Sequence, residues 1–196
     1  MVDTVRFAID WATEVGHLAA REPAPLEVAS RATELSLGYN DPLNAHLLGH
    51  DEPISADEVI EHYAAMFDEG ARMFLLYRDD HFVGDADLRG LRDGAAEFAF
   101  MIAAPTEQGK GLGTRFATMV HAFAFATLGL HHVYASIVPA NTASRRVFDK
   151  LGYVVDTGPI ARGYADHPDD IVMAIDRATF EQAHARALGE IRIAPR

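Results

Sequence analysis

Cysteine is absent from the sequence. A chain without cysteine forms no disulfides, offers no thiolate to a metal ion and has no cysteine nucleophile. Long apolar runs are absent too, and no stretch reaches the length that spans a bilayer. The opening stretch MVDTVRFAIDWATEV carries early acids and no apolar segment of the secretory kind. The sequence therefore predicts a cytoplasmic protein without a membrane partner.

Basic residues are scarce relative to acidic ones. The chain has 17 Lys and Arg against 29 Asp and Glu, a formal net charge of −12. This balance argues against nucleic-acid binding, which needs a basic surface, and mildly favours a cationic partner. The 196 residues are 49% hydrophobic, which is enough for the core of a single domain.

The apolar pattern predicts alternating helices and strands. Ser55 and Glu58 form a capping box at the start of one helix. Helices are expected over 26–36, 55–68, 111–128, 141–151 and 177–189, with a short one within 40–49. Strands are expected over 5–9, 73–79, 81–91, 97–103, 132–138, 153–156 and 170–175. This order predicts an α/β (α+β) fold in one domain, with a mixed, mostly antiparallel central sheet flanked by helices.

The stretch QGKGLGT, residues 108–114, links an expected strand to an expected helix. Its glycines let backbone N–H groups converge without obstruction, and the helix N-terminus adds free N–H groups and a positive dipole end. Together these features favour a phosphate site. The P-loop pattern fails because Gly111 follows Lys110, and the dinucleotide fingerprint fails because residue 114 is Thr. The alternative is a glycine-rich connection that binds nothing.

Three stretches resemble one family. QGKGLG matches the Q/R-x-x-G-x-G/A motif of the GNAT superfamily of acetyl-CoA-dependent N-acetyltransferases. ANTASRRVFDKLGYVV (140–155) and RGYADHPDDIVMAI (162–175) resemble the later segments of its RimJ/RimL-like branch, which acetylates protein N-termini and small amines. The resemblance covers roughly 55–176. Residues 1–54 are then a variable acceptor-side segment, and 177–196 a C-terminal helix and tail of the same domain.

The resemblance implies direct transfer of the acetyl group of acetyl-CoA to a primary amine, within a ternary complex and without a metal. The acceptor is a small cationic amine or a peptide N-terminus, and the protein is a monomer or homodimer. The resemblance also implies a set of residues that contact acetyl-CoA. These are Ile102, Ala103, Ala104, Gln108, Gly109, Lys110, Gly111, Leu112, Gly113, Thr114, Asn141 and Ser144. Lys110 is alternatively a solvated loop lysine, and Asn141 serves equally well as a helix N-cap.

The resemblance leaves the acid that protonates the leaving thiolate open. Many relatives place a tyrosine where this chain has Phe148, which has no proton to donate. Ser144 is the first candidate, although it also suits a surface position near the helix start. Tyr153, Tyr134 and water are the remaining alternatives.

Glu97 is the candidate general base, because some relatives use a glutamate at this strand position. It opens the strand 97–103 on the face opposite Phe98 and Phe100. Partial burial would lift its pKa toward neutrality. The alternative is a solvated glutamate at a strand end. Tyr164, in the acidic loop before the last strand, is the candidate acceptor contact.

Two other functions compete with acetyl transfer. The first is an acyl-CoA-binding sensor or scaffold without turnover, which the phenylalanine at 148 permits. The second is a nucleotide-binding transferase that uses the glycine loop for another phosphate ligand. The Asn141 segment argues against the second, because it would have no task there.

Overall fold

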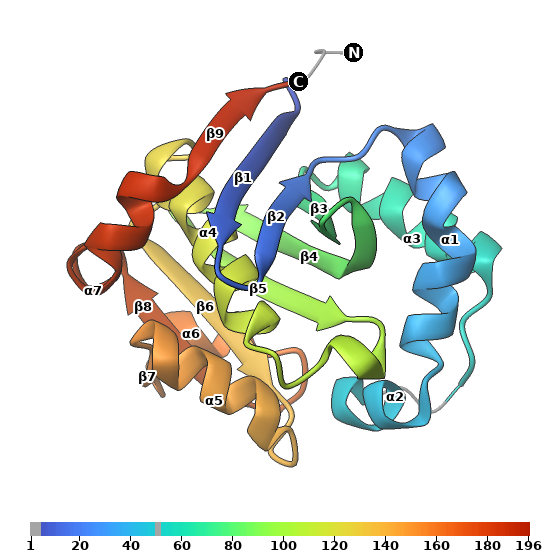
Figure 1. Ribbon diagram of the computed structural model, residues 1–196. Coiled ribbons are helices and arrows are strands. Elements are labelled where there is room, and N and C mark those ends of the chain that lie inside the picture. The colour runs from blue at the N-terminus through green and yellow to red at the C-terminus, as the bar shows by residue number, and fades with distance from the viewer. Residues whose placement is uncertain (1–4, 50–51) are drawn as a thin grey trace.

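The computed structural model describes residues 5–49 and 52–196, and within them all strands belong to one nine-stranded sheet (Figure 1). The strand order is β7-β8-β6-β5-β4-β3-β2-β1-β9, and only β5 and β6 pair in parallel. The strands are β1 Phe7–Thr13, β2 Gly16–Arg21, β3 Arg72–Arg78, β4 His81–Arg92, β5 Ala95–Ile102, β6 His132–Ile137, β7 Val154–Val155, β8 Ile171–Asp176 and β9 Arg192–Pro195. The expected mixed, mostly antiparallel sheet is confirmed.

Helices cover both faces of this sheet (Figure 1). They are α1 Pro25–Tyr39, α2 Pro42–Leu48, α3 Ala56–Asp68, α4 Leu112–Ala126, α5 Thr142–Leu151, α6 Pro159–Arg162 and α7 Arg177–Glu190. The capping box predicted for α3 is present: Glu58 N–H donates to Ser55 Oγ at 3.2 Å, and Ser55 N–H donates to Glu58 Oε2 at 2.7 Å. The helices predicted from apolar periodicity are therefore found, with boundaries shifted by a few residues.

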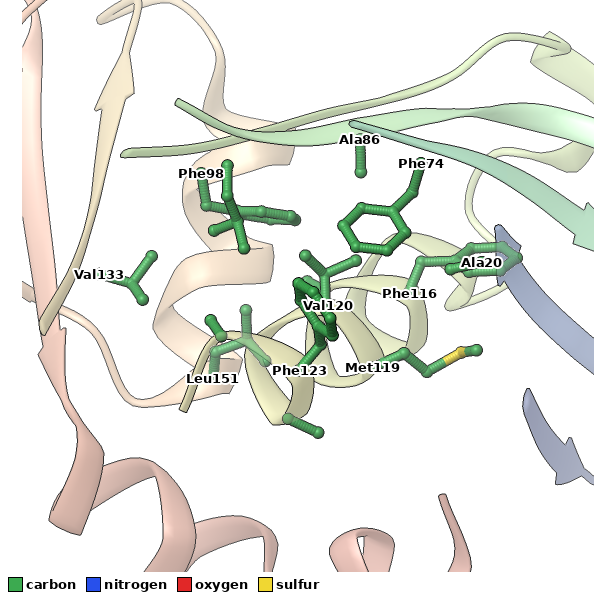
Figure 2. Packing of buried hydrophobic residues seen from close by; sticks show 14 of the residues in the cluster. Ala20, Phe74, Ala86, Phe98, Phe116, Met119, Val120, Phe123, Val133 and Leu151 are labelled. Carbon is green, nitrogen blue, oxygen red and sulfur yellow. The ribbon is translucent and has the colours of Figure 1, made fainter. Parts of the chain in front are cut away.

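The larger core lies between the sheet and α4. Phe116, Val120 and Phe123 of α4 belong to one buried cluster with Phe74 and Phe98 of the sheet (Figure 2). All five side chains are at most 1% exposed. A second core on the opposite face packs α1 and α3 against β3 and the end of β5. The two cores hold β4 and β5 between them, so this pair is buried on both faces.

The sequence did not predict the edge formed by β1, β2 and β9. An opening strand was expected over 5–9, but β1 runs to Thr13 and returns as β2, while β9 pairs with its outer side. In β2 the buried residues Leu18, Ala19 and Ala20 are consecutive, so the strand lacks the alternation of apolar and polar residues that would have predicted it. In β9 four residues ending in Pro195 carry little β propensity. Both β2 and β9 are therefore stabilised mainly by hydrogen bonds to the neighbouring strands.

The parallel pair β5–β6 separates partway along its length. Its register runs from Ala95 opposite His132 to Glu97 opposite Tyr134, whereas β5 continues to Ile102 and β6 to Ile137. Beyond this point the two strands leave space between them. Gly84 lies opposite Ile102 on the other side of β5, with φ of 155°. A Cβ added there would lie 2.0 Å from the Met101 carbonyl oxygen.

We expect Gly84→Ala to lower the free energy of unfolding by about 2 kcal/mol or more, because its Cβ would force β4 away from β5. Urea denaturation measures the change. Gly189→Ala, on α7 with no atom near its added Cβ, is the matched control and should retain or raise stability. Equal stability of Gly84→Ala and the wild type would show that the strand pair tolerates the methyl group.

Candidate functional site

Two cavities open between the separating strands β5 and β6. The first, of about 420 Å³, we call the acidic pocket; the second, of about 290 Å³, we call the glycine-loop crevice. The residues common to both walls are Leu47, Leu48, Phe100, Met101, Asn141 and Ser144. The cavities therefore meet beside the N-terminus of α5, where a group bound in one can reach a group bound in the other.

The glycine-loop crevice runs past the N-terminus of α4. No side chain caps this helix, whereas Ser55 caps α3 and Asn141 caps α5. Gly109 and Gly111 have φ of 73° and 77°, a conformation that L side chains rarely adopt. The first N–H groups of α4 are thus left for another partner, and the helix dipole makes an anion the favoured one.

Cations line the crevice opposite the glycine loop, but they are not the predicted one. Lys110 pairs with Glu107 at 3.1 Å and is not part of the crevice wall. Arg146 and Lys150 of α5 lie on that wall instead. Sequence analysis missed both, although their spacing places them on one face of the helix. The crevice combines helix N–H groups with two side-chain cations, an arrangement suited to phosphate groups.

Most of the residues predicted to contact acetyl-CoA line the crevice. They are Ile102, Gln108, Gly109, Gly111, Leu112, Gly113, Thr114, Asn141 and Ser144. Ala103 and Ala104 do not. The Ala103 N–H donates to Val83 O at 2.9 Å, and its carbonyl accepts from Asn44 Nδ2 at 3.2 Å. Because strand residues alternate in direction, Phe100 and Ile102 rather than Ala103 direct their N–H groups away from β4 and toward the cavities.

Helix α2 spans the opening between the two walls. Asn44 Oδ1 accepts from Gln108 Nε2 at 2.8 Å, and Gln108 also donates to the Ile102 carbonyl at 3.0 Å. At the other wall, Asn141 Nδ2 donates to the Leu47 carbonyl at 3.0 Å, while its Oδ1 caps α5 through the Ser144 N–H at 2.9 Å. The N-cap role expected of Asn141 is confirmed. Its contact with acetyl-CoA stays a prediction.

The candidates for the acid that protonates the leaving thiolate differ in whether they reach the cavities. Ser144 lines both cavities where they meet. The Tyr153 hydroxyl is buried against His121 Nε2, and neither it nor Tyr134 lines the acidic pocket or the crevice. Phe148 is 2% exposed and packs its ring against Phe98, Phe100 and Tyr153. Among these side chains, Ser144 alone combines a hydroxyl with access to the meeting point.

Carboxylates dominate the acidic pocket. It is lined by Glu58, Asp85, Asp87, Asp166 and Asp170, against one guanidinium, Arg89, and two imidazoles, His62 and His167. Asp85 and Asp87 come from the interior of β4, which makes them the most deeply placed. The pocket therefore carries a net negative charge at neutral pH, and it suits a cationic ligand.

Burial raises the pKa of both β4 carboxyls. The pKa of Asp85 rises to about 6, although hydrogen bonds from Tyr39 and Tyr63 lower it in part. The pKa of Asp87 rises to about 7; Arg89 opposes the rise, and the charges of Asp85, Glu97 and Asp166 add to it. The Oδ1 atom of each of these two carboxyls is buried and has no hydrogen-bond partner. Asp87 is thus able to exchange a proton near neutral pH.

Glu97, the predicted base, does not line the pocket. It is 6% exposed and forms a two-point ion pair with Arg89: Nη2 to Oε1 at 2.7 Å and Nε to Oε2 at 3.1 Å. Burial raises the pKa of Glu97 above its usual range, as expected, and Arg89 offsets this rise only in part. Arg89 Nη2 also contacts Asp166 at 2.8 Å, so it joins β5 to the acidic loop. Glu97 is outside the pocket wall and both its oxygens already accept from Arg89, so it is not placed to take a proton from a ligand in the pocket.

Tyr164, the predicted acceptor contact, lies away from the cavities. Its ring stacks on Tyr134 with 4.5 Å between centroids, and the Arg92 guanidinium lies 3.9 Å from its centroid. Only 4% of the residue is exposed. The same loop instead presents Asp166 and Asp170 to the pocket, with Asp170 Oδ2 accepting from Ser136 Oγ at 2.7 Å. The structure does not bring Tyr164 to the site.

Asp85 and Asp87 are two further site residues that sequence reasoning missed. The signal was present in GDADLR (84–89), where two acids alternate within an expected strand. Acids rarely occupy one face of a buried central strand without a function. Within residues 5–49 and 52–196, no group of three or more His, Asp or Glu is arranged to hold a metal ion. In the same ranges, no helix has the length and apolar character of a membrane span.

Comparisons with known proteins agree on one family. The model of the acetyltransferase (GNAT) domain matches residues 28–154. A probable N-acetyltransferase of Bacillus subtilis, YjcK, is 34% identical over 77 residues, which are 38% of this chain and 42% of that protein. The alignment thus spans less than half of the curated relative.

Solved structures share the fold at low sequence identity. Mycobacterium smegmatis RimJ, in complex with CoA-disulfide, has a TM-score of 0.71 and 18% identity, over 94% of this chain and 96% of that one. Vibrio cholerae spermidine N-acetyltransferase, in complex with CoA and spermine, has a TM-score of 0.65 and 22% identity, over 83% and 97%. These likenesses bear on the fold.

Proposed function

Because the chain belongs to the GNAT acetyltransferase family, we propose that it transfers the acetyl group of acetyl-CoA directly to a primary amine. The acyl donor occupies the glycine-loop crevice and the amine occupies the acidic pocket, so both are bound together when transfer occurs. The observation that carries this proposal is the junction of the two cavities at Ser144, with Asp87 on the far wall.

Different groups of this chain bind different parts of the acyl donor. The N-terminal N–H groups of α4, with Arg146 and Lys150, hold the phosphate groups of the donor. Backbone N–H groups of Phe100 and Ile102 pair with its extended arm. The likeness to RimJ, whose structure contains a CoA derivative, supports a donor of the CoA type.

The chemical step needs a neutral amine. Asp87, with its pKa near 7, accepts a proton from the bound ammonium group. The amine nitrogen then forms a bond to the acetyl carbon as the carbon–sulfur bond breaks. The nitrogen gives up its second proton and the leaving thiolate takes up one, with Ser144 or water passing the proton between them. We propose Asp87 as the base in place of Glu97, because Arg89 holds both Glu97 oxygens.

The acceptor is a cationic amine. Five carboxylates line the acidic pocket against one guanidinium, and the chain as a whole carries −12. A small amine and a peptide N-terminus both fit this charge, and both suit the RimJ/RimL-like branch. The spermine bound in the Vibrio cholerae structure supports the small-amine reading.

We expect acetyl-CoA and CoA to stabilise the protein, whereas ATP and NAD at equal concentration leave it unchanged. A ligand that binds only the folded state adds about 2.7 kcal/mol at one hundred times its dissociation constant. Thermal shift measures this, and thiol release in the presence of amines then measures transfer. Stabilisation by ATP instead would favour a nucleotide-binding transferase. Stabilisation by acetyl-CoA without transfer to any amine would favour an acyl-CoA sensor.

A further inference from the structure

The two carboxyls of β4 that line the acidic pocket form a pair with a defined spacing. Asp85 and Asp87 stand on the same face of the strand, because side chains alternate along it, and they are about 7 Å apart along the strand axis. Ala86, between them, points into the opposite core and is 3% exposed. Both carboxyls line the acidic pocket. A ligand in this pocket therefore meets two anionic groups at a defined separation.

The environments of the two carboxyls differ. Asp85 Oδ2 accepts hydrogen bonds from the Tyr39 hydroxyl at 2.6 Å and from the Tyr63 hydroxyl at 2.8 Å, which fix the side chain. Asp87 has instead a distant cation, Arg89 Nη1, at 3.9 Å from its Oδ1. Asp85 is thus a fixed anion, and Asp87 is the carboxyl more easily protonated.

Each carboxyl also has a buried oxygen that needs a partner. Asp85 is 6% exposed, and its Oδ1, like that of Asp87, makes no hydrogen bond. Leaving a buried carboxylate oxygen unpaired is unfavourable. One ammonium ion can satisfy one of these oxygens. The other would remain unpaired if the ligand carried a single amine.

On the premise that the proposed function holds, we propose that the acceptor is a short diamine whose nitrogens lie about 6–7 Å apart, matching the two-residue repeat of β4. One nitrogen binds Asp85 Oδ1 as an ammonium ion and keeps its protons. The other gives one proton to Asp87, attacks the acetyl carbon and becomes the amide nitrogen. It loses its second proton as the carbon–sulfur bond breaks, and the leaving thiolate takes up that proton. The product retains one positive charge, held at Asp85.

The walls of the pocket suit the carbon chain of such a ligand. Leu47, Ile54, Val59 and Phe100 supply apolar surface beside the acids. With ordinary single-bond lengths, an extended four-carbon diamine places its nitrogens about 6 Å apart. A divalent cation is a poorer match, since in the described ranges no three metal-binding side chains converge.

Acetylation rates for a series of diamines of three to six carbons, compared with butylamine, test this inference in the whole chain with acetyl-CoA. We expect kcat/KM for the four-carbon diamine to exceed that for butylamine by about 30-fold or more, since a monoamine leaves the Oδ1 atom of one of the two carboxylates without a partner. In Asp85→Asn this ratio falls toward one. The matched control Asp68→Asn, an exposed acid on α3 outside the pocket wall, keeps it.

The outcomes separate the inference from the proposed function. Equal kcat/KM for butylamine and every diamine, or a kcat/KM that keeps rising up to six carbons, would overturn the diamine inference while acetyl transfer stands. Acetyl-CoA binding without acetylation of any amine would overturn the proposed function itself. If Asp85→Asn fails to fold, the chain-length series on the wild type still decides the spacing.

Discussion

Asp87→Asn is expected to lower kcat/KM for amine acetylation by about 10²–10⁴-fold near pH 7, the usual contribution of a general base. The asparagine retains the size of the side chain and cannot take a proton. Binding of acetyl-CoA should be unchanged, because Asp87 lines the acidic pocket and not the glycine-loop crevice. Thiol release measures the rate, and thermal shift measures the binding.

The pH profile adds a second reading of the same variant. In the wild type, kcat/KM should rise with pH through about 7 as Asp87 ionises. In Asp87→Asn this rise should be lost, and activity should recover only where the amine deprotonates in solution. Glu97→Gln serves as the comparison, and we expect a smaller loss because Glu97 acts through Arg89. A variant at position 87 with the wild-type rate at pH 7 would exclude Asp87 as the base.

The same substitution is expected to stabilise the fold at neutral and higher pH. The folded-state pKa of Asp87, about 7, lies above its ordinary value of 3.8. A carboxyl with a raised pKa favours folding fully below pH 4, and this contribution is lost as pH rises through 7. Three pKa units correspond to about 4 kcal/mol, which is the largest gain that asparagine can give at pH 8.

Urea denaturation at pH 8, 6 and 5 measures this effect. The difference between Asp87→Asn and the wild type should be largest at pH 8 and shrink as pH falls. Asp68→Asn, a change of the same chemistry at an exposed position, should show little pH dependence. A lower stability of Asp87→Asn than of the wild type at pH 8 would contradict this prediction. It would mean that the attraction between Asp87 and Arg89 stabilises the fold by more than the burial of the Asp87 charge destabilises it.

Short-range sequence patterns predicted the helices and strands that are stabilised by contacts between residues close together in the sequence. The capping box of Ser55 and the apolar stripe of α4 are short-range signals, and both are found in the structure. The glycine loop lies at the start of α4 as expected. By contrast, β2 and β9 are stabilised by pairing with strands far away in the sequence, and short-range patterns carry no record of that pairing.

The site was predicted in part for a related reason. A site built from backbone N–H groups, such as the glycine loop, can be located from the sequence motif alone. Side-chain chemistry depends on what a residue faces: Glu97 meets Arg89 across the β4–β5 ladder, and Tyr164 meets Tyr134. Neither partner could be assigned from spacing alone. The sequence shows Asp85 and Asp87 as alternating acids in an expected strand. It does not show that they lie deep in the protein, because that depends on the two cores that pack on either face of the sheet.

Helix α2 gives the two cavities a common roof. Asn44 attaches it to the β5 wall, and the Leu47 carbonyl attaches it to Asn141 at the α5 wall. A ligand that draws either wall toward this roof changes the free energy of binding on the other side. Thermodynamic reciprocity then requires that donor and acceptor alter each other's affinity by the same factor. We therefore expect the two proposed substrates to affect each other's binding through this short helix.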